Sequence, residues 1–316
     1  MLKVRFSEES DIIVPEKEGV KIYHQLIDSQ FLDLFMPSNK SYKIVDENDK
    51  ADICIVGTQH TSNDLLRDDE INIFFSHENF SAGRLHYQHF NKFGKYGNPK
   101  IDLYIYNDEI IPSQKVIPMI YMRINYFNKL NDINSKLYYE KAREFMGNMN
   151  TPFKDKKFCL FISQNMLNFN KQIVVRMLSE LGQIDTLQSI AKINKNLQNC
   201  NCFNSFELLK LFNQYKFIIC FENSKTVGYI TEKIFNTFLA KSIPIYDGDP
   251  EVERFINKSA FLYFDDNIIQ KVKLIMNNED LYKNIINKPK VKELDFSYIN
   301  NNFNEIVTKS CHSKIQ

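Results

Sequence analysis

Short apolar runs alternate with helical patterns along the first half of the chain. Apolar residues at three- and four-residue steps over residues 23–36 are typical of an amphipathic helix, and residues 62–70 are typical of a capped helical turn. Between such patterns lie runs rich in Ile, Val, Phe and Tyr, which favour strands, at residues 2–6, 51–57, 71–76, 102–107 and 117–122. This alternation predicts a mostly parallel sheet covered by helices.

The same alternation begins again after an amphipathic stretch at 135–149 and a polar segment that contains Pro152. Here the pattern predicts strands at 158–164, 216–223 and 242–248, and helices at 171–183, 205–215, 229–241, 267–277, 280–287 and 296–309. We therefore place a domain boundary there, giving domains 1–152 and 153–316. Two α/β domains joined by a short linker make the cleft between them the expected site.

Composition and charge narrow the function classes. Hydrophobic residues make up 43% of the 316 residues, enough for a buried core, and the net charge of +1 disfavours nucleic acid as a partner. No apolar run is long enough to span a membrane, and charges interrupt the N-terminus where a signal peptide needs an apolar run. We expect a cytoplasmic protein, or one held at a membrane surface, without a transmembrane segment.

Neither the cysteines nor the aspartates are spaced as in a typical metal-binding site. The six cysteines contain no CxxC pair, and the one-residue spacing of Cys200 and Cys202 suits tetrahedral zinc poorly. Asp247 and Asp249 flank Gly248 in a segment typical of a tight turn, which favours turn residues over a metal-binding pair. No metal is expected.

The segment 221–233 combines three features suited to a nucleotide sugar. No GxxxxGK or GxGxxG motif is present, which disfavours nucleoside triphosphatases and dehydrogenases. A helix beginning near Thr231 would offer a positive end to phosphate, with Lys233 adding a cation. Glu222 and Glu232 could hold sugar or ribose hydroxyls. The simpler interpretation makes Thr231 an N-cap, Glu232 a dipole partner and Lys233 a solvated residue.

Residues 217–266 resemble the donor-binding core of family 10 glycosyltransferases, the α1,3/4-fucosyltransferases, and bacterial members most of all. The resemblance rests on ordered motifs, namely FENS at 221–224, GYITEK at 228–233, IPIYDGDP at 243–250 and a KSAF segment followed by an acidic pair. It implies a GT-B fold of two Rossmann-like domains facing a central cleft. It also implies a GDP-fucose donor, inversion at the fucose anomeric carbon and no required catalytic metal or other cofactor.

The resemblance also assigns donor-binding residues. Tyr229, Glu232 and Lys233 match the family's YxTEK residues, with Lys233 on the diphosphate, Glu232 on sugar or ribose hydroxyls and Asn223 beside them. The family's phosphate-binding arginine falls on Lys171, which can neutralise phosphate but lacks the bidentate fork of arginine. Arg176 could replace it from further along the helix.

Glu78 is the candidate general base. It follows the apolar run 71–76, and the ends of strands in parallel α/β sheets carry functional loops. It matches the family's general-base glutamate, although His77 stands where bacterial relatives have glycine. An inverting transfer needs one carboxylate to take the proton of the acceptor hydroxyl.

The expected acceptor is an oligosaccharide or glycoconjugate, stacked on aromatic side chains of the first domain. Two alternatives stay open: a GT-B glycosyltransferase that uses another nucleotide sugar, and a catalytically silent carbohydrate-binding homologue. Lys171 favours the first alternative, and the presence of Glu78, Tyr229, Glu232 and Lys233 argues against the second.

Overall fold

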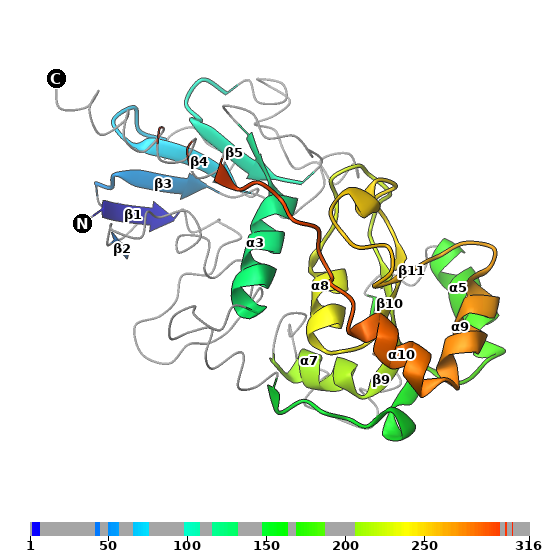
Figure 1. The fold of residues 1–316 in the computed structure, drawn as a ribbon. Helices are drawn as coiled ribbons and strands as arrows, with labels where there is room; N and C mark the ends of the chain where they lie inside the picture. Colours follow the sequence, from blue (N-terminus) through cyan, green and yellow to red (C-terminus); the bar gives the residue numbers. More distant parts are fainter. Residues whose placement is uncertain are drawn as a thin grey trace.

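In the described part of the chain the strands form two sheets (Figure 1). The computed structural model describes residues 2–6, 42–44, 50–56, 66–75, 98–107, 116–131, 147–163, 169–186, 206–297, 301 and 305. Every pairing between the named strands is parallel. The α/β class with parallel sheets predicted from the sequence is confirmed.

The first sheet has the strand order β2-β1-β3-β4-β5-β6. Its strands are β1 (Leu2–Phe6), β2 (Tyr42–Ile44), β3 (Ile53–Val56), β4 (Ile71–Phe75), β5 (Leu103–Tyr106) and β6 (Val116–Pro118). All five residues of β4 are buried, as expected for a central strand covered on both faces. Each of the runs predicted as a strand contains one. The short strand β2 was not predicted, because no apolar run marks it in the sequence.

The last predicted strand of this half is wrong beyond Pro118. Instead of continuing to residue 122, the chain turns into helix α3 (Met119–Asn131) directly after β6. Met119, Ile120 and Met122 are as buried as the strand residues, so a continuous apolar run could not distinguish a buried strand from a buried helix.

The second sheet has the order β11-β10-β9-β7-β8. Its strands are β7 (Lys157–Phe161), β8 (Ile184–Thr186), β9 (Tyr215–Phe221), β10 (Ile243–Asp247) and β11 (Leu262–Tyr263). The accompanying helices are η3 (Phe153–Asp155), α5 (Phe169–Ser179), α7 (Phe206–Asn213), α8 (Glu232–Leu239), η5 (Val252–Arg254), α9 (Ile268–Met276) and α10 (Glu279–Ile286). Except for β8, β11 and the two short 3-10 helices, these elements were predicted.

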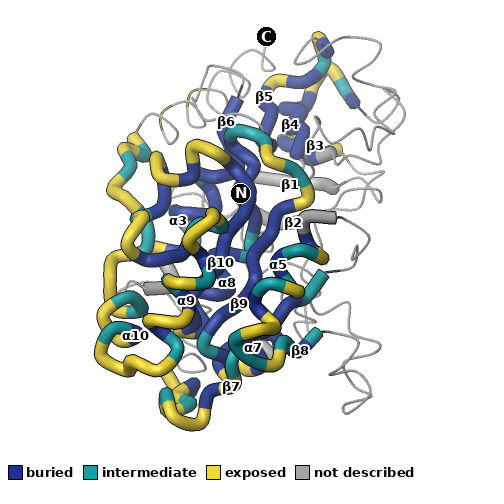
Figure 2. Tube along the Cα trace, turned by 90° about the vertical axis from the view of Figure 1, so that its right-hand side faces the viewer, coloured by how far each residue is buried: buried dark blue, intermediate teal, exposed yellow. Residues whose placement is uncertain are grey.

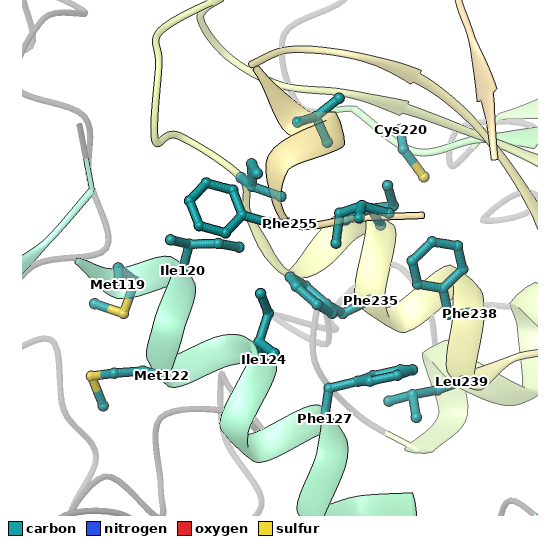
Figure 3. Close-up of a cluster of buried hydrophobic side chains, with 14 of the residues drawn as sticks. Met119, Ile120, Met122, Ile124, Phe127, Cys220, Phe235, Phe238, Leu239 and Phe255 are labelled. Atoms are coloured by element: carbon teal, nitrogen blue, oxygen red, sulfur yellow. The ribbon is translucent and has the colours of Figure 1, made fainter. Parts of the chain in front are cut away.

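A shared apolar cluster joins the two sheets through α3 and α8. Phe127 of α3 lies with its ring centroid 5.7 Å from that of Phe235 and 6.2 Å from that of Phe238, both on α8. Figure 3 shows the two helices facing each other across these rings. The described residues of β3 to β6, β9 and β10 are mostly buried, while exposed residues gather on helices and loops (Figure 2). Residues 291–296 return to α3, where Tyr121 and Phe296 meet edge to face.

Some predictions lie outside the described residues. The helix expected at 23–36, most of those expected at 135–149 and 296–309, and the first part of the turn at 62–70, residues 62–65, belong to this group. The boundary near residue 152 falls between β6 and β7, just before η3, and stays a prediction.

Candidate functional site

The candidate site lies where β9 and β10 end. Because the two strands are parallel and adjacent, their carboxyl ends open at the same edge of the sheet. Glu222, the residue after β9, donates its backbone N–H to the carbonyl of Asp247 at 2.8 Å. The loop after β9 therefore starts from a fixed point and leads into α8.

Glu222 organises the start of α8. One carboxylate oxygen, Oε1, accepts the backbone N–H of Thr231 at 2.7 Å. The other, Oε2, accepts the Thr231 hydroxyl at 2.7 Å and Nζ of Lys233 at 2.9 Å. Its side chain has 0% exposure. The prediction that Glu222 holds sugar hydroxyls is therefore wrong, because its oxygens are engaged within the protein and out of reach of a ligand.

Thr231 occupies the N-cap position of α8 but its hydroxyl does not cap the helix. The hydroxyl instead donates to Glu222 and accepts a hydrogen bond from Lys233 Nζ at 3.0 Å. The simpler interpretation of the sequence is therefore right about the N-cap position of Thr231 and the place of Glu232 in the first turn. It is wrong about the solvated lysine, because Lys233 is bound by Glu222 and Thr231. Thr231 and Glu222 together hold the ammonium group of Lys233 in one place.

The charges around Lys233 keep it positive. Burial lowers the pKa of Lys233, but the negative charges of Glu222 and Glu232 outweigh burial and hold the pKa above its ordinary value. For Glu232, burial raises the pKa, yet Lys233 and Arg123 hold it below the ordinary value. The Lys233 side chain is 28% exposed, so its charge is fixed but still reaches the surface. Such a cation suits an anionic ligand.

Two glycines make this arrangement possible. Gly228 adopts a φ of 87°, which favours glycine, and its N–H donates to Asp249 Oδ2 at 2.9 Å. A Cβ on Gly248 would lie 2.5 Å from Glu222 Cγ and 2.5 Å from the Tyr246 hydroxyl oxygen. The turn that follows β10 therefore packs directly on Glu222, and only a glycine fits at position 248.

Asp247 and Asp249 belong to this turn. Asp249 is fully buried and also accepts the N–H of Glu251 at 2.7 Å, while Asp247 Oδ1 lies 2.7 Å from Nζ of Lys225. These contacts agree with the predicted turn role. Among the described residues, no group of three His, Cys, Asp or Glu side chains is placed to hold a metal ion.

Lys171 lies near the start of α5, which follows β7. Its residue exposure is 4%, and Nζ lies 3.0 Å from the hydroxyl of Ser163, two residues after β7 ends. Arg176 is exposed and sits in the last turn of α5, about 7.5 Å further along the helix axis. Of the two, Lys171 lies nearer the carboxyl edge of the sheet.

The other predicted residues differ in what the structure says of them. Tyr229 is buried, with 3% exposure, while Asn223 is exposed in the loop after β9. Glu78 lies outside the described residues. The structure thus brings Glu232 and Lys233 together with Glu222 and Thr231. The catalytic role of Glu78 and the donor-binding roles of the other predicted residues stay predictions: Lys171, Asn223, Tyr229, Glu232 and Lys233.

Sequence reasoning missed Arg123 entirely. It lies on α3 and is almost completely buried, and its Nη1 donates to the carbonyl of Ile230 in the loop before α8. The available signal was an arginine within the otherwise apolar run 117–124. Its partner is distant in sequence, which hides the pairing from any local pattern.

Comparison with known proteins agrees with the predicted resemblance. Residues 151–312 match the model of the family described as glycosyltransferase family 10 (fucosyltransferase), C-terminal part. An α-(1,3)-fucosyltransferase of Helicobacter pylori is 32% identical over 137 residues, 39% of this chain and 28% of that protein. A provisionally named fucosyltransferase of Acanthamoeba polyphaga mimivirus is 32% identical over 151 residues, 45% of this chain and 25% of that protein.

A solved structure shows the fold. A crystal structure of an α1,3-fucosyltransferase with GDP-fucose superposes with a TM-score of 0.59 at 20% identity, covering 100% of this chain and 90% of that one. The predicted GT-B fold is confirmed. The chain spans about a quarter of the length of the two curated relatives it matches.

No helix among the described residues is both long and apolar enough to cross a bilayer. Where the protein resides stays a prediction.

Proposed function

The chain belongs to glycosyltransferase family 10, the fucosyltransferases, and on that premise we propose that it moves fucose from GDP-fucose to an oligosaccharide or glycoconjugate hydroxyl. We propose an α1,3-type linkage and inversion at the anomeric carbon. A relative and a structural neighbour named as α1,3-fucosyltransferases support this choice, and that neighbour is described with GDP-fucose.

The observation that carries the proposal is the cation at the start of α8. Lys233 is held by Glu222 Oε2 and the Thr231 hydroxyl, at the carboxyl edge of the second sheet. A diphosphate placed there would meet a fixed ammonium group and the positive end of a helix. Glu232, kept anionic by Lys233 and Arg123, would accept hydrogen bonds from sugar or ribose hydroxyls.

The proposed reaction is a single displacement. Glu78 takes the proton of the acceptor hydroxyl while its oxygen attacks the anomeric carbon of fucose from the face opposite GDP. The bond from that carbon to the diphosphate oxygen breaks, and GDP leaves with the bonding electron pair. Lys233 would stabilise the negative charge that develops on the leaving diphosphate. No metal or covalent enzyme intermediate takes part in this scheme.

A second donor is considered because of Lys171. It replaces an arginine fork with a single point charge, which would bind the phosphates of other nucleotide sugars equally well. The test is a panel of GDP-fucose, GDP-mannose, UDP-sugars and GDP, measured by thermal shift and by donor hydrolysis with and without EDTA. Stabilisation by GDP and GDP-fucose alone supports the proposal. Equal stabilisation by UDP-sugars rejects it, and activity restored only by manganese rejects the metal-free scheme.

Glu78→Gln separates the base from a binding residue. Glutamine keeps the side-chain volume but cannot take the proton, so transfer to a lactosamine-type acceptor should fall on the order of 10²- to 10⁴-fold. GDP-fucose affinity, measured by calorimetry, should stay near the wild-type value. Turnover within a few-fold of wild type would reject Glu78 as the base, and a parallel loss of donor affinity would make it a binding residue.

A further inference from the structure

Arg123 is a buried cation supplied to the candidate site from the first half of the chain. It is 1% exposed, and its Nη1 lies 2.5 Å from the carbonyl oxygen of Ile230. Its Nε is buried without a hydrogen-bond partner among the described residues. Burying a guanidinium that is only partly satisfied is costly, and an apolar residue of similar size would often be neutral or more stable.

Packing of α3 on α8 does not need this arginine. The two helices already meet through Phe127, Phe235 and Phe238 (Figure 3). The reason for burying Arg123 must therefore lie in the group that it binds, the peptide group between Ile230 and Thr231.

That peptide group is held at both ends. Arg123 donates to its carbonyl oxygen, and Glu222 Oε1 accepts its N–H from Thr231 at 2.7 Å. The first partner comes from α3 and the second from the end of β9. Glu232 and Lys233 directly follow Thr231 in the chain. The orientation of this peptide group therefore determines the backbone position from which both side chains extend.

We propose that Arg123 is a positioning residue that, together with Glu222, clamps the Ile230–Thr231 peptide and thereby orients Glu232 and Lys233 toward the diphosphate sugar. The inference rests on the proposed function, since it assigns those two residues to the donor. It adds that the donor site is completed by a residue of the first half. The charge of Arg123 also helps to keep Glu232 anionic.

The test compares Arg123→Met with a matched control, Lys156→Met. Lys156 is also a buried cation that donates to a backbone carbonyl, that of Asn213, but at the opposite end of the second sheet, where β7 and β9 begin. The melting temperature of both variants is measured alongside, so that a general effect of destabilisation can be recognised. Only Arg123→Met should raise the dissociation constant of GDP and the KM of GDP-fucose, on the order of 10-fold.

The split between the variants decides the inference. Arg123→Met with wild-type affinity for GDP would overturn the role of Arg123 while leaving the donor assignment intact. Equal losses of affinity in both variants would overturn it too, because they would indicate a general effect of destabilisation. A wild-type protein that GDP does not stabilise would instead overturn the proposed function, and the inference with it.

A second variant covers the case in which Arg123→Met does not fold. Arg123→Lys keeps the charge but not the geometry of the guanidinium. Because Arg123 and Glu222 hold the same peptide group, the effects of Arg123→Lys and Glu222→Gln on GDP affinity should be less than additive in the double variant. Strict additivity would contradict the clamp.

Discussion

Glu222 and Asp185 are two buried carboxylates of the second sheet with different surroundings. Glu222 has 0% side-chain exposure and binds the ammonium group of Lys233 at 2.9 Å, itself only 28% exposed. Asp185 of β8 instead accepts from neutral groups, the Tyr215 hydroxyl at 2.7 Å and the Gln183 amide at 2.8 Å. Its lysine, Lys157, is 3.5 Å away and 56% exposed.

The difference separates a structural carboxylate from one that supports a site. The Asp185 contacts would be complete without Lys157, and they link elements of one sheet. Glu222 fixes a cation whose remaining hydrogen-bonding capacity points to a further, anionic partner. Burial of a carboxylate therefore says little by itself, and what matters is whether the burial immobilises a reactive or binding group.

The largest expected effect is on kcat/KM, and it distinguishes Lys233 from Lys157. Lys233→Met should lower kcat/KM for GDP-fucose on the order of 100-fold or more, because it removes the charge opposite the diphosphate. Lys157→Met should leave kcat/KM near the wild-type value, because exposed ion pairs contribute little. Steady-state kinetics with both variants checks this, and similar losses in the two would contradict the distinction.

Folding of the Lys233 variant needs its own control. Removing one partner of a buried pair leaves an unbalanced charge and costs about 3–5 kcal/mol. The double variant Lys233→Met/Glu222→Gln removes that charge, so it should regain stability without regaining activity. Recovery of activity along with stability would mean that Lys233 serves the fold alone.

A smaller effect is expected from neutralising the carboxylates themselves. Glu222→Gln should raise the KM of GDP-fucose on the order of 10-fold, because Lys233 loses its ionic partner. Asp185→Asn should leave the kinetics unchanged and lower the free energy of unfolding by about 1.5–3 kcal/mol. A KM change of the same size in Asp185→Asn would remove the contrast between the two groups.

Asp185 also has a defined pH signature. Burial raises its pKa, but hydrogen bonds from Tyr215 and Gln183 and the charge of Lys157 outweigh burial and hold the pKa below its ordinary value. A depressed pKa in the folded state stabilises the fold above the unfolded-state pKa of about 3.9, and this stability is lost as pH falls through the folded-state value. Wild type should therefore lose more stability than Asp185→Asn below about pH 4, as measured by chemical denaturation.

The smallest expected effect concerns the turn against Glu222. Gly248→Ala would place a Cβ 2.5 Å from Glu222 Cγ, so it should destabilise the fold by about 1–3 kcal/mol and raise the KM of GDP-fucose slightly. Gly147→Ala is the matched control, because a Cβ there meets nothing within 4 Å. Equal stability of the two variants, measured by thermal unfolding, would mean that the turn relaxes away from Glu222.

Much of the second sheet could be predicted from sequence because its longer strands are continuous apolar runs between helices. The strands β8 and β11 have three and two residues, too few for a periodic signal. The error after Pro118 has a different cause, since burial on every side removes the polar positions that distinguish a helix from a strand.

The candidate site shows a similar limit. The motif GYITEK places Glu232 and Lys233 in the first turn of α8, as predicted. The partners that fix them were not predicted correctly. Glu222 was assigned to ligand hydroxyls, because a motif does not tell whether a side chain points outward or into the protein. Arg123 was missed because its contact with Ile230 joins residues 107 positions apart.

The most direct test of the central claim is the affinity for GDP relative to GMP in wild type and Lys233→Met, measured by calorimetry. If Lys233 binds the diphosphate, wild type should prefer GDP over GMP, and the variant should lose most of that preference, with a change on the order of 10-fold or more. GMP affinity itself should change little. An unchanged preference for GDP in the variant would show that the diphosphate binds elsewhere and would contradict the site described at the start of α8.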